Sequence, residues 1–113
     1  TGHIACITDK DTVIAVSGTS KKDLLEQKIS PDLEKIFNTR QRFVGDGSNS
    51  IFITEKGNKD KEIKPQVICP IISDGDVIGS VVLISKDDNT KMEKTEEEVA
   101  SVAATFLGSQ MEI

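Results

Sequence analysis

The sequence predicts an α+β fold in which helices cover both faces of a five-stranded antiparallel sheet. Within Gln66–Lys86, two β-branched runs flank Asp74-Gly75, a pair that tolerates the positive φ angles of a two-residue hairpin turn. The second run, Val77–Ser85, is apolar at odd and even positions, which is typical of a strand buried on both faces. Each face then needs a cover, and the helical segments elsewhere in the chain must supply it.

Alternation along the second arm of this hairpin assigns its side chains to opposite faces. One face receives Val77, Val81 and Leu83, and the other receives Ile78, Val82 and Ile84. Gly79 and Ser80 would leave room above the sheet, either for a closely packed helix or for a ligand. In the first arm, Pro70 lacks an amide hydrogen for the ladder, which predicts a bulge or an edge position.

Three further segments complete the predicted sheet. His3–Asp9 and Thr12–Ser17 are β-rich runs separated by a polar pair, so they should form the first hairpin. Ser50–Glu55 alternates between polar and apolar residues and is expected to be the next strand. With the two arms of the later hairpin, these segments make five strands.

Two short helices are expected before Ser50. Ser20 can cap a first helix that ends at Glu26. The order Ser30-Pro31 places a capping serine before a proline at the first helical position, and it begins a second helix that runs to Thr39. The apolar residues of this second helix, expected to be buried, are Leu33, Ile36 and Phe37.

The final segment is the strongest helix signal in the chain. Thr95 and Glu98 have capping-box spacing, and acidic residues in the first turn favour the helix dipole. The apolar arc of this helix is wider than a helix lying on a sheet requires. We assign its sheet-facing stripe to Val99, Val102 and Phe106. The extra flank, which we expect to form a dimer interface with another helix, comprises Ala100, Ala103, Ala104, Leu107 and Met111.

Charge and composition exclude several classes of partner. Fourteen basic against nineteen acidic side chains give a net charge of −5, which repels a phosphate backbone, so we expect no direct nucleic-acid binding by this chain. No apolar run approaches the roughly 20 residues that span a bilayer, and no signal-peptide pattern is visible, which favours a cytoplasmic domain without a membrane partner.

Few residues offer covalent, metal or cofactor chemistry. Cys6 and Cys69 stand in apolar strand patterns and are more readily explained as buried hydrophobes than as redox groups. His3 has no visible catalytic partner and is expected to be an exposed terminal residue. The glycine-rich stretch Gly45–Ser50 matches neither the Walker pattern nor a dinucleotide fingerprint, so an ordinary loop is preferred to a phosphate site. We therefore expect no cofactor and no metal.

The element order resembles the GAF and PAS class of sensor domains. Two segments are similar to the GAF pattern: ITDKDTVIAVSG at Ile7–Gly18 and CPIISDGDVIGSVVLIS at Cys69–Ser85. With SKKDLL at Ser20–Leu25 and FLGSQME at Phe106–Glu112, almost the whole chain resembles the GAF-like C-terminal regulatory domains of the stage V sporulation protein T family. These belong to sporulation transcription factors of the transition-state-regulator type.

The resemblance implies a single regulatory domain over residues 1–113 that acts in the cytoplasm of the forespore. It also implies an N-terminal DNA-binding domain and a leading helix beside the last one, and the 113 residues contain neither. Two other GAF roles fit poorly. A free-methionine-sulfoxide reductase needs a cluster of cysteines, and a cyclic-nucleotide receptor carries an NKFDE signature, neither of which this sequence has.

Three hypotheses follow for the function. The first is a non-enzymatic sensory domain that binds a small ligand and transmits its occupancy through paired helices. Fold analogy assigns its ligand pocket to Arg42, Phe43, Asp46, Ser48, Ser50, Phe52, Thr54, Cys69, Ser80 and Val82. Arg42 would pair with an anionic ligand group, while Phe43 or Phe52 would provide an apolar wall. The second hypothesis is a dimerisation module that binds no ligand, and the third is a thiol-based redox enzyme that uses Cys69.

Overall fold

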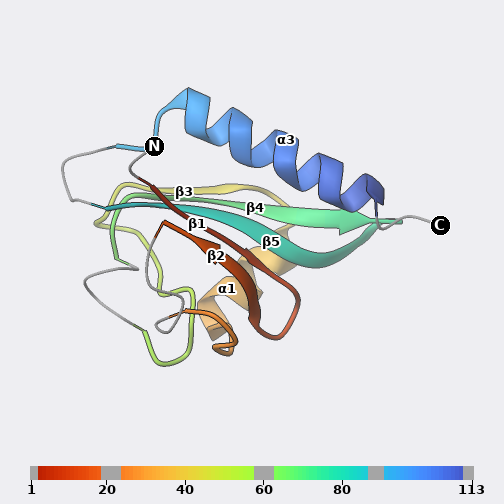
Figure 1. The fold of residues 1–113 in the computed structure, drawn as a ribbon, viewed down its shortest axis with the longest axis horizontal. Coiled ribbons are helices and arrows are strands. Elements are labelled where there is room, and N and C mark those ends of the chain that lie inside the picture. Colours follow the sequence, from red (N-terminus) through yellow and green to blue (C-terminus); the bar gives the residue numbers. More distant parts are fainter. Residues whose placement is uncertain (1–2, 19–23, 58–62, 87–90, 111–113) are drawn as a thin grey trace.

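The computed structural model describes residues 3–18, 24–57, 63–86 and 91–110, and these form the predicted α+β architecture. The strands are β1 (His3–Thr8), β2 (Val13–Ser17), β3 (Phe43–Gly45), β4 (Gln66–Ser73) and β5 (Asp76–Ser85), and the helices are α1 (Pro31–Thr39) and α3 (Lys94–Gln110). The strand order is β2-β1-β5-β4-β3, and every neighbouring pair is antiparallel. Figure 1 shows α3 on one face of this sheet and α1 on the other, which confirms the predicted fold class.

The β4–β5 hairpin forms as predicted and contains one bulge. Asp74 and Gly75 adopt φ angles of 51° and 84° in the turn. Further along, Ile71 pairs with Gly79 and Ile72 pairs with Val77, so Ile78 of β5 has no partner on β4.

This bulge makes the predicted faces of two residues wrong. Val77 packs against the cluster on the α1 side, and Ile78 packs against the cluster on the α3 side. Beyond the bulge the assignment is correct, because Val82 and Ile84 face α1 while Val81 and Leu83 face α3. The strand is therefore buried on both faces.

The room expected above Gly79 and Ser80 is filled by strand β1. A Cβ atom on Gly79 would collide with the carbonyl oxygen of Thr8. The hydroxyl of Ser80 lies 2.8 Å from the hydroxyl of Thr8 in a buried hydrogen bond. Strand β1 therefore takes the position that the sequence left open to a helix or a ligand. Pro70 lies beyond the last described pairing of β3 with β4 and next to the bulge, consistent with the expected edge position.

The prediction of a strand at Ser50–Glu55 is wrong, and β3 takes its place in the sheet. The segment is held by other groups: the amide side chain of Gln66 accepts a hydrogen bond from Ile51 N (2.9 Å) and donates one to Ile51 O (3.1 Å). Ser30 N also donates to Ile53 O, and Ile53 is fully buried. The alternation in this segment reflects burial of Ile53 without a continuous ladder.

Helix α1 follows its sequence signals closely. The Ser30 side chain accepts a hydrogen bond from Leu33 N at 3.1 Å, and Pro31 occupies the first turn. The three apolar residues predicted to be buried, Leu33, Ile36 and Phe37, are buried. Of the earlier helix predicted from Ser20 to Glu26, residues 19–23 lie outside the described residues, and 24–26 form a turn.

Helix α3 begins at Lys94, two residues before Glu96, the first helical residue that a Thr95 cap predicts. The capping contact joins Glu93 N to the Glu96 carboxylate at 2.7 Å, so it does not involve Thr95 and Glu98. The division of its apolar arc is the reverse of the prediction. Ala100, Ala104 and Gly108 are buried against the sheet, with Ala103 and Leu107 packed beside them. Val99, Val102 and Phe106 are 57%, 69% and 61% exposed. Met111 lies outside the described residues.

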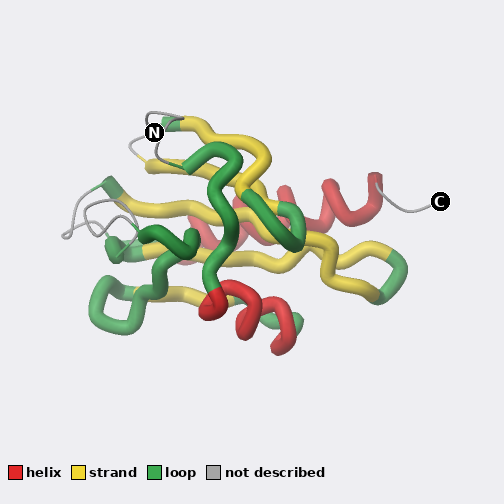
Figure 2. The backbone as a smooth tube through the Cα atoms, turned by 90° about the horizontal axis from the view of Figure 1, so that it is seen from below, coloured by secondary structure: helices red, strands yellow, loops and turns green. Residues whose placement is uncertain are grey.

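The reason for this reversal is the closeness of α3 to the sheet. A Cβ atom on Gly108 would collide with the carbonyl oxygen of Ile72 in β4. Small side chains allow this approach, whereas a stripe of valine and phenylalanine would hold the helix away. Figure 2, in which the sheet is seen from below, shows α1 in front of the strands and α3 behind them.

Candidate functional site

The predicted ligand-pocket residues do not form one cavity. Phe43 and Val82 contribute to the hydrophobic cluster on the α1 side, whereas Cys69 belongs to the cluster on the α3 side. Ser80 is fully buried in its bond with Thr8. The sheet itself separates the two groups.

The loop that follows β3 satisfies its own polar groups. The Asp46 carboxylate accepts hydrogen bonds from Ser48 N (2.9 Å), Ser48 Oγ (2.7 Å) and Asn49 N (3.3 Å). These bonds lower the pKa of Asp46, and the bond from the Ser48 hydroxyl has the largest effect. Ser50 Oγ accepts from Gly47 N at 3.0 Å. The geometry fits the ordinary loop that the sequence favoured.

Phe52 and Thr54 hold their segment to its neighbours. The Phe52 carbonyl accepts a hydrogen bond from Ser30 Oγ at 2.5 Å, and Thr54 Oγ1 accepts one from Gly57 N at 3.3 Å. Thr54 is buried, and the Phe52 ring lies against Gly57. Both residues act in packing here.

Arg42 lies on the α3 side of the molecule. Its Nε atom is 3.9 Å from Oε1 of Glu97 in the first turn of α3. Burial raises the pKa of the nearby Cys69 thiol, and Glu97 adds to this effect while Arg42 opposes it. A thiol with a raised pKa holds its proton, so this environment does not activate Cys69 as a nucleophile.

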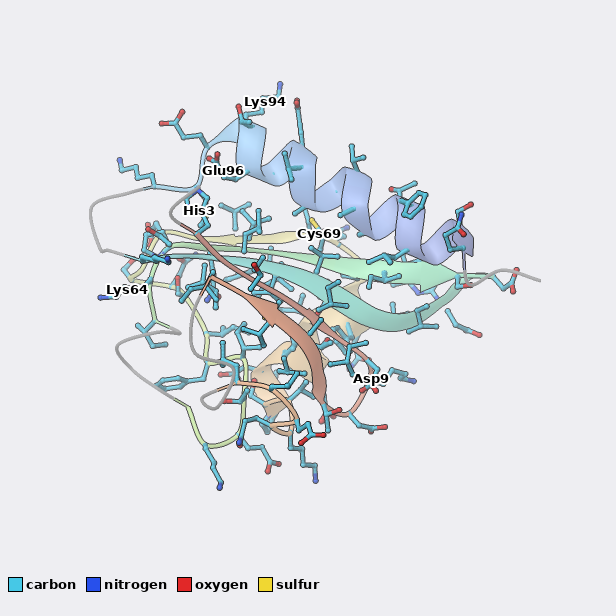
Figure 3. The ribbon with its side chains drawn as sticks, in the orientation of Figure 1. His3, Asp9, Lys64, Cys69, Lys94 and Glu96 are labelled. Atoms are coloured by element: carbon cyan, nitrogen blue, oxygen red, sulfur yellow. The ribbon has the colours of Figure 1, made fainter. Side chains whose placement is uncertain are left out.

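The two cysteines face opposite sides of the sheet. Cys6 pairs with Val82 and Cys69 pairs with Val81, which are neighbours on β5 with side chains on opposite faces. The two thiols therefore cannot bond to each other in this fold. Figure 3 shows the Cys69 sulfur between the sheet and α3.

His3 is not the exposed terminal residue that the sequence predicted. Its side chain is largely buried, and Nε2 lies 4.0 Å from Oε2 of Glu96. In Figure 3 the two side chains point toward one another across the space between β1 and the start of α3. This contact connects the first strand to the last helix.

An apolar groove that the sequence did not reveal lies between α3 and the β1–β2 hairpin. Helix α3 packs mainly on β4 and β5, and it covers less of the same face of β1 and β2. The groove has a volume of about 310 Å³ and is lined by Ala5, Cys6, Ile7, Ala15, Val16, Ser17, Val81, Leu83, Val99, Ala100 and Ala103. Val99 also belongs to the exposed stripe of α3, so groove and stripe form one continuous apolar surface.

A second, polar pocket of about 580 Å³ lies on the other side of the sheet, at the end of α1. Its walls come from three segments distant in the sequence, which is why pattern analysis did not find it. The lining residues are Lys10, Phe37, Asn38, Arg40, Asp76, Val77 and Ile78. The Arg40 guanidinium donates a hydrogen bond to the carbonyl of Gly75 in the hairpin turn.

The described residues contain neither a membrane-spanning helix nor a cluster of metal ligands. None of the helices in residues 3–18, 24–57, 63–86 and 91–110 is long and apolar enough to cross a membrane. Over the same part of the chain, no three His, Cys, Asp or Glu side chains gather in a way that could hold a metal ion.

Comparison with known proteins gives both sequence and fold relatives. Residues 1–112 match the family described as "Stage V sporulation protein T C-terminal, transcription factor". The chain is 38% identical over 111 residues to stage V sporulation protein T of Bacillus subtilis (strain 168), covering 98% of this chain and 60% of the relative. It thus spans less than two thirds of that relative's length.

Two solved structures share the fold at low sequence identity. The type II free methionine-R-sulfoxide reductase from Thermoplasma acidophilum gives a TM-score of 0.69 at 11% identity, with 94% of this chain and 76% of that chain covered. The GAF domain/HD domain protein from Geobacter sulfurreducens gives 0.62 at 22% identity, with coverages of 98% and 82%.

Proposed function

The chain belongs to the family of C-terminal domains of stage V sporulation protein T, a transcription factor, and we propose that it is a non-enzymatic regulatory domain that self-associates and responds to a small ligand. In this proposal, DNA contact is the task of other parts of the transcription factor. The acidic net charge of −5 supports that division. The site of action is the cytoplasm of the forespore.

The exposed apolar stripe of α3 carries the proposal. Val99, Val102 and Phe106 recur at helical spacing and each is more than half exposed. The adjoining groove extends this surface across Ala5 and Ala15. Contiguous exposed apolar surface of this kind marks interaction sites. The partner that we propose is the same surface of a second copy.

Charge favours an antiparallel arrangement of the two helices. The first turn of α3 carries Glu96 and Glu97, with Glu98 following. A parallel pair would place these acidic turns side by side, where like charges repel. A twofold axis perpendicular to the helix instead sets each acidic turn beside the other helix's C-terminal half. The stripe spans only about 10 Å along the helix, so we expect weak, concentration-dependent association.

Sedimentation velocity tests this self-association directly. The wild-type sedimentation coefficient should rise with concentration, while Val102→Glu should remain monomeric because it places a charge in the stripe. Thr105→Glu adds the same charge on the exposed polar side of α3 and should behave like wild type. A wild-type chain that stays monomeric at all concentrations, or equal effects of both variants, would refute the proposed interface.

A dimerisation module that binds no ligand is the alternative to a ligand-responsive domain. A constitutive dimerisation module would self-associate through the same stripe and bind nothing. The 580 Å³ polar pocket favours the sensor, because it sets the charged side chains of Lys10, Arg40 and Asp76 beside apolar residues in one concave site. A metabolite screen by ligand-detected NMR separates the two, because saturable binding of any natural compound contradicts the ligand-free module.

A further inference from the structure

We propose that the polar pocket at the end of α1 binds a small organic anion with an apolar body, and that its occupancy acts on α3 through the bulge residue Ile78. This inference rests on the proposed sensory function and names its site. It also replaces the predicted pocket, whose residues the sheet separates.

The charges of the pocket favour an anionic group. Lys10 and Arg40 supply two cations against the single carboxylate of Asp76. None of the three takes part in a salt bridge within the described part of the chain. The neighbouring Asp9 carboxylate is committed to the β1–β2 turn, where it accepts from Asp11 N (2.7 Å) and Thr12 N (2.8 Å). The lining therefore carries one more cation than anion, on a chain of net charge −5.

The backbone conformation of Arg40 is a second, independent reason to assign a binding function to this pocket. Arg40 caps α1 in the left-handed region, with φ of 61°, a position that usually holds glycine. A bulky residue is disfavoured there, and such backbone outliers cluster at functional sites. Its guanidinium reaches the Gly75 carbonyl across the pocket, which leaves further N–H groups for an anion.

The remaining walls accept an apolar body. Phe37 is buried at the floor, while Val77 and Ile78 are partly buried at the side. A phosphate ion alone would leave these walls uncovered. The combination therefore fits a carboxylate attached to a hydrocarbon or aromatic group.

The bulge connects this pocket to the opposite face of the sheet. Ile78 lines the pocket yet packs against the α3-side cluster that includes Leu107. Ile78 and Leu107 also border a cavity of about 140 Å³ on the α3 side, so Ile78 has space into which it can move. A ligand that presses on Ile78 thereby changes the support beneath the C-terminal half of α3.

NMR titration of the wild-type chain tests both steps with 3-phenylpropionate as the probe and 3-phenylpropanol as its neutral control. The carboxylate should cause saturable amide shifts at Lys10, Arg40 and Ile78, followed by smaller shifts at Leu107. The alcohol should bind about tenfold more weakly, because it lacks the charge-assisted hydrogen bonds. Absence of saturable shifts at millimolar probe overturns the binding site, and shifts that stop at Ile78 overturn the connection to α3.

Variants of the charged residues at the exposed rim of the pocket test whether Arg40 and Asp76 control carboxylate binding. Arg40→Gln should weaken carboxylate binding about tenfold, and Asp76→Asn should strengthen it, because one removes an attractive and the other a repulsive charge. Lys35→Gln, an exposed α1 position outside the pocket, is the matched control and should leave binding unchanged. Equal weakening by all three variants would contradict recognition at this pocket.

The two proposals can fail separately. Self-association is measured by sedimentation without any probe, and probe binding is measured by NMR on the Val102→Glu monomer. Probe binding without self-association would support the ligand pocket and refute the dimer. Self-association without probe binding would support the dimer and refute the ligand pocket.

Discussion

The two helices of this domain meet the same sheet in opposite ways. Helix α1 presents large side chains, Leu33, Ile36 and Phe37, to a continuous cluster. Helix α3 presents alanines and Gly108 to the sheet and turns its large apolar residues outward. The α1 face thus forms a closed hydrophobic core. Helix α3 covers mainly β4 and β5 and leaves an apolar groove beside β1 and β2. Large apolar residues on a helix therefore indicate which surface needs a partner, and that surface need not be the nearest sheet.

The strongest test of this contrast truncates one large apolar residue on each helix. Leu33→Ala should lower the free energy of unfolding by about 2 to 5 kcal/mol, because Leu33 is fully buried and leaves a cavity. Phe106→Ala should change it by less than about 0.5 kcal/mol, since Phe106 is 61% exposed. Urea denaturation at low protein concentration measures both. A Phe106 effect as large as that of Leu33 would place Phe106 in the core of the single chain.

A second test concerns the close approach of α3. Gly108→Ala should destabilise by about 1 to 3 kcal/mol, although alanine favours helix, because its Cβ meets the Ile72 carbonyl. Ser109→Ala, on the exposed side of the same turn, is the matched control. A stabilised Gly108→Ala variant would mean that α3 does not sit this close to β4.

The neighbours Val81 and Val82 compare the two faces within one strand. Val82→Ala should cost about 1 to 3 kcal/mol, because Val82 is fully enclosed on the α1 side. Val81→Ala should cost less, since Val81 already borders the open groove. Chemical denaturation of the two variants ranks the faces, and a larger loss at Val81 would reverse the comparison.

The smallest effect is expected at the Cys69 thiol. Its raised pKa means that the folded chain keeps this proton at pH values where the unfolded chain has lost it. The contribution to stability is therefore present at neutral pH and declines as the pH rises above the ordinary thiol range of about 8.5. Iodoacetamide labelling followed by peptide mapping should show slower modification of Cys69 than in urea-unfolded protein. Equal rates at neutral pH would revive the thiol-enzyme hypothesis.

Sequence patterns predicted those parts of the fold that depend on local rules. The Asp74-Gly75 turn and the Ser30 cap were correct because each is decided within a few residues. The prediction of a strand at Ser50–Glu55 was wrong, because alternation of polar and apolar residues indicates burial of one side and does not require a sheet. Hydrogen bonds between the Gln66 side chain and the backbone of Ile51 take the place of strand pairing.

The sites were harder to predict, because they depend on tertiary contacts. The apolar arc of α3 was identified, but its orientation is decided by how closely Gly108 approaches Ile72. The polar pocket joins Lys10, Arg40 and Asp76, which no spacing rule connects. Fold analogy instead selected residues on both sides of the sheet.

The small side chains through which α3 contacts the sheet also affect local unfolding. Alanine and glycine bury little apolar area, so detaching α3 exposes much less surface than opening the sheet. The helix can therefore open as a separate unit at lower free energy than the strands, and its amide hydrogens should exchange with solvent before those of β4 and β5. Self-association would then slow exchange in α3 alone, which makes the exchange rate of one helix a direct report of whether the chain is paired.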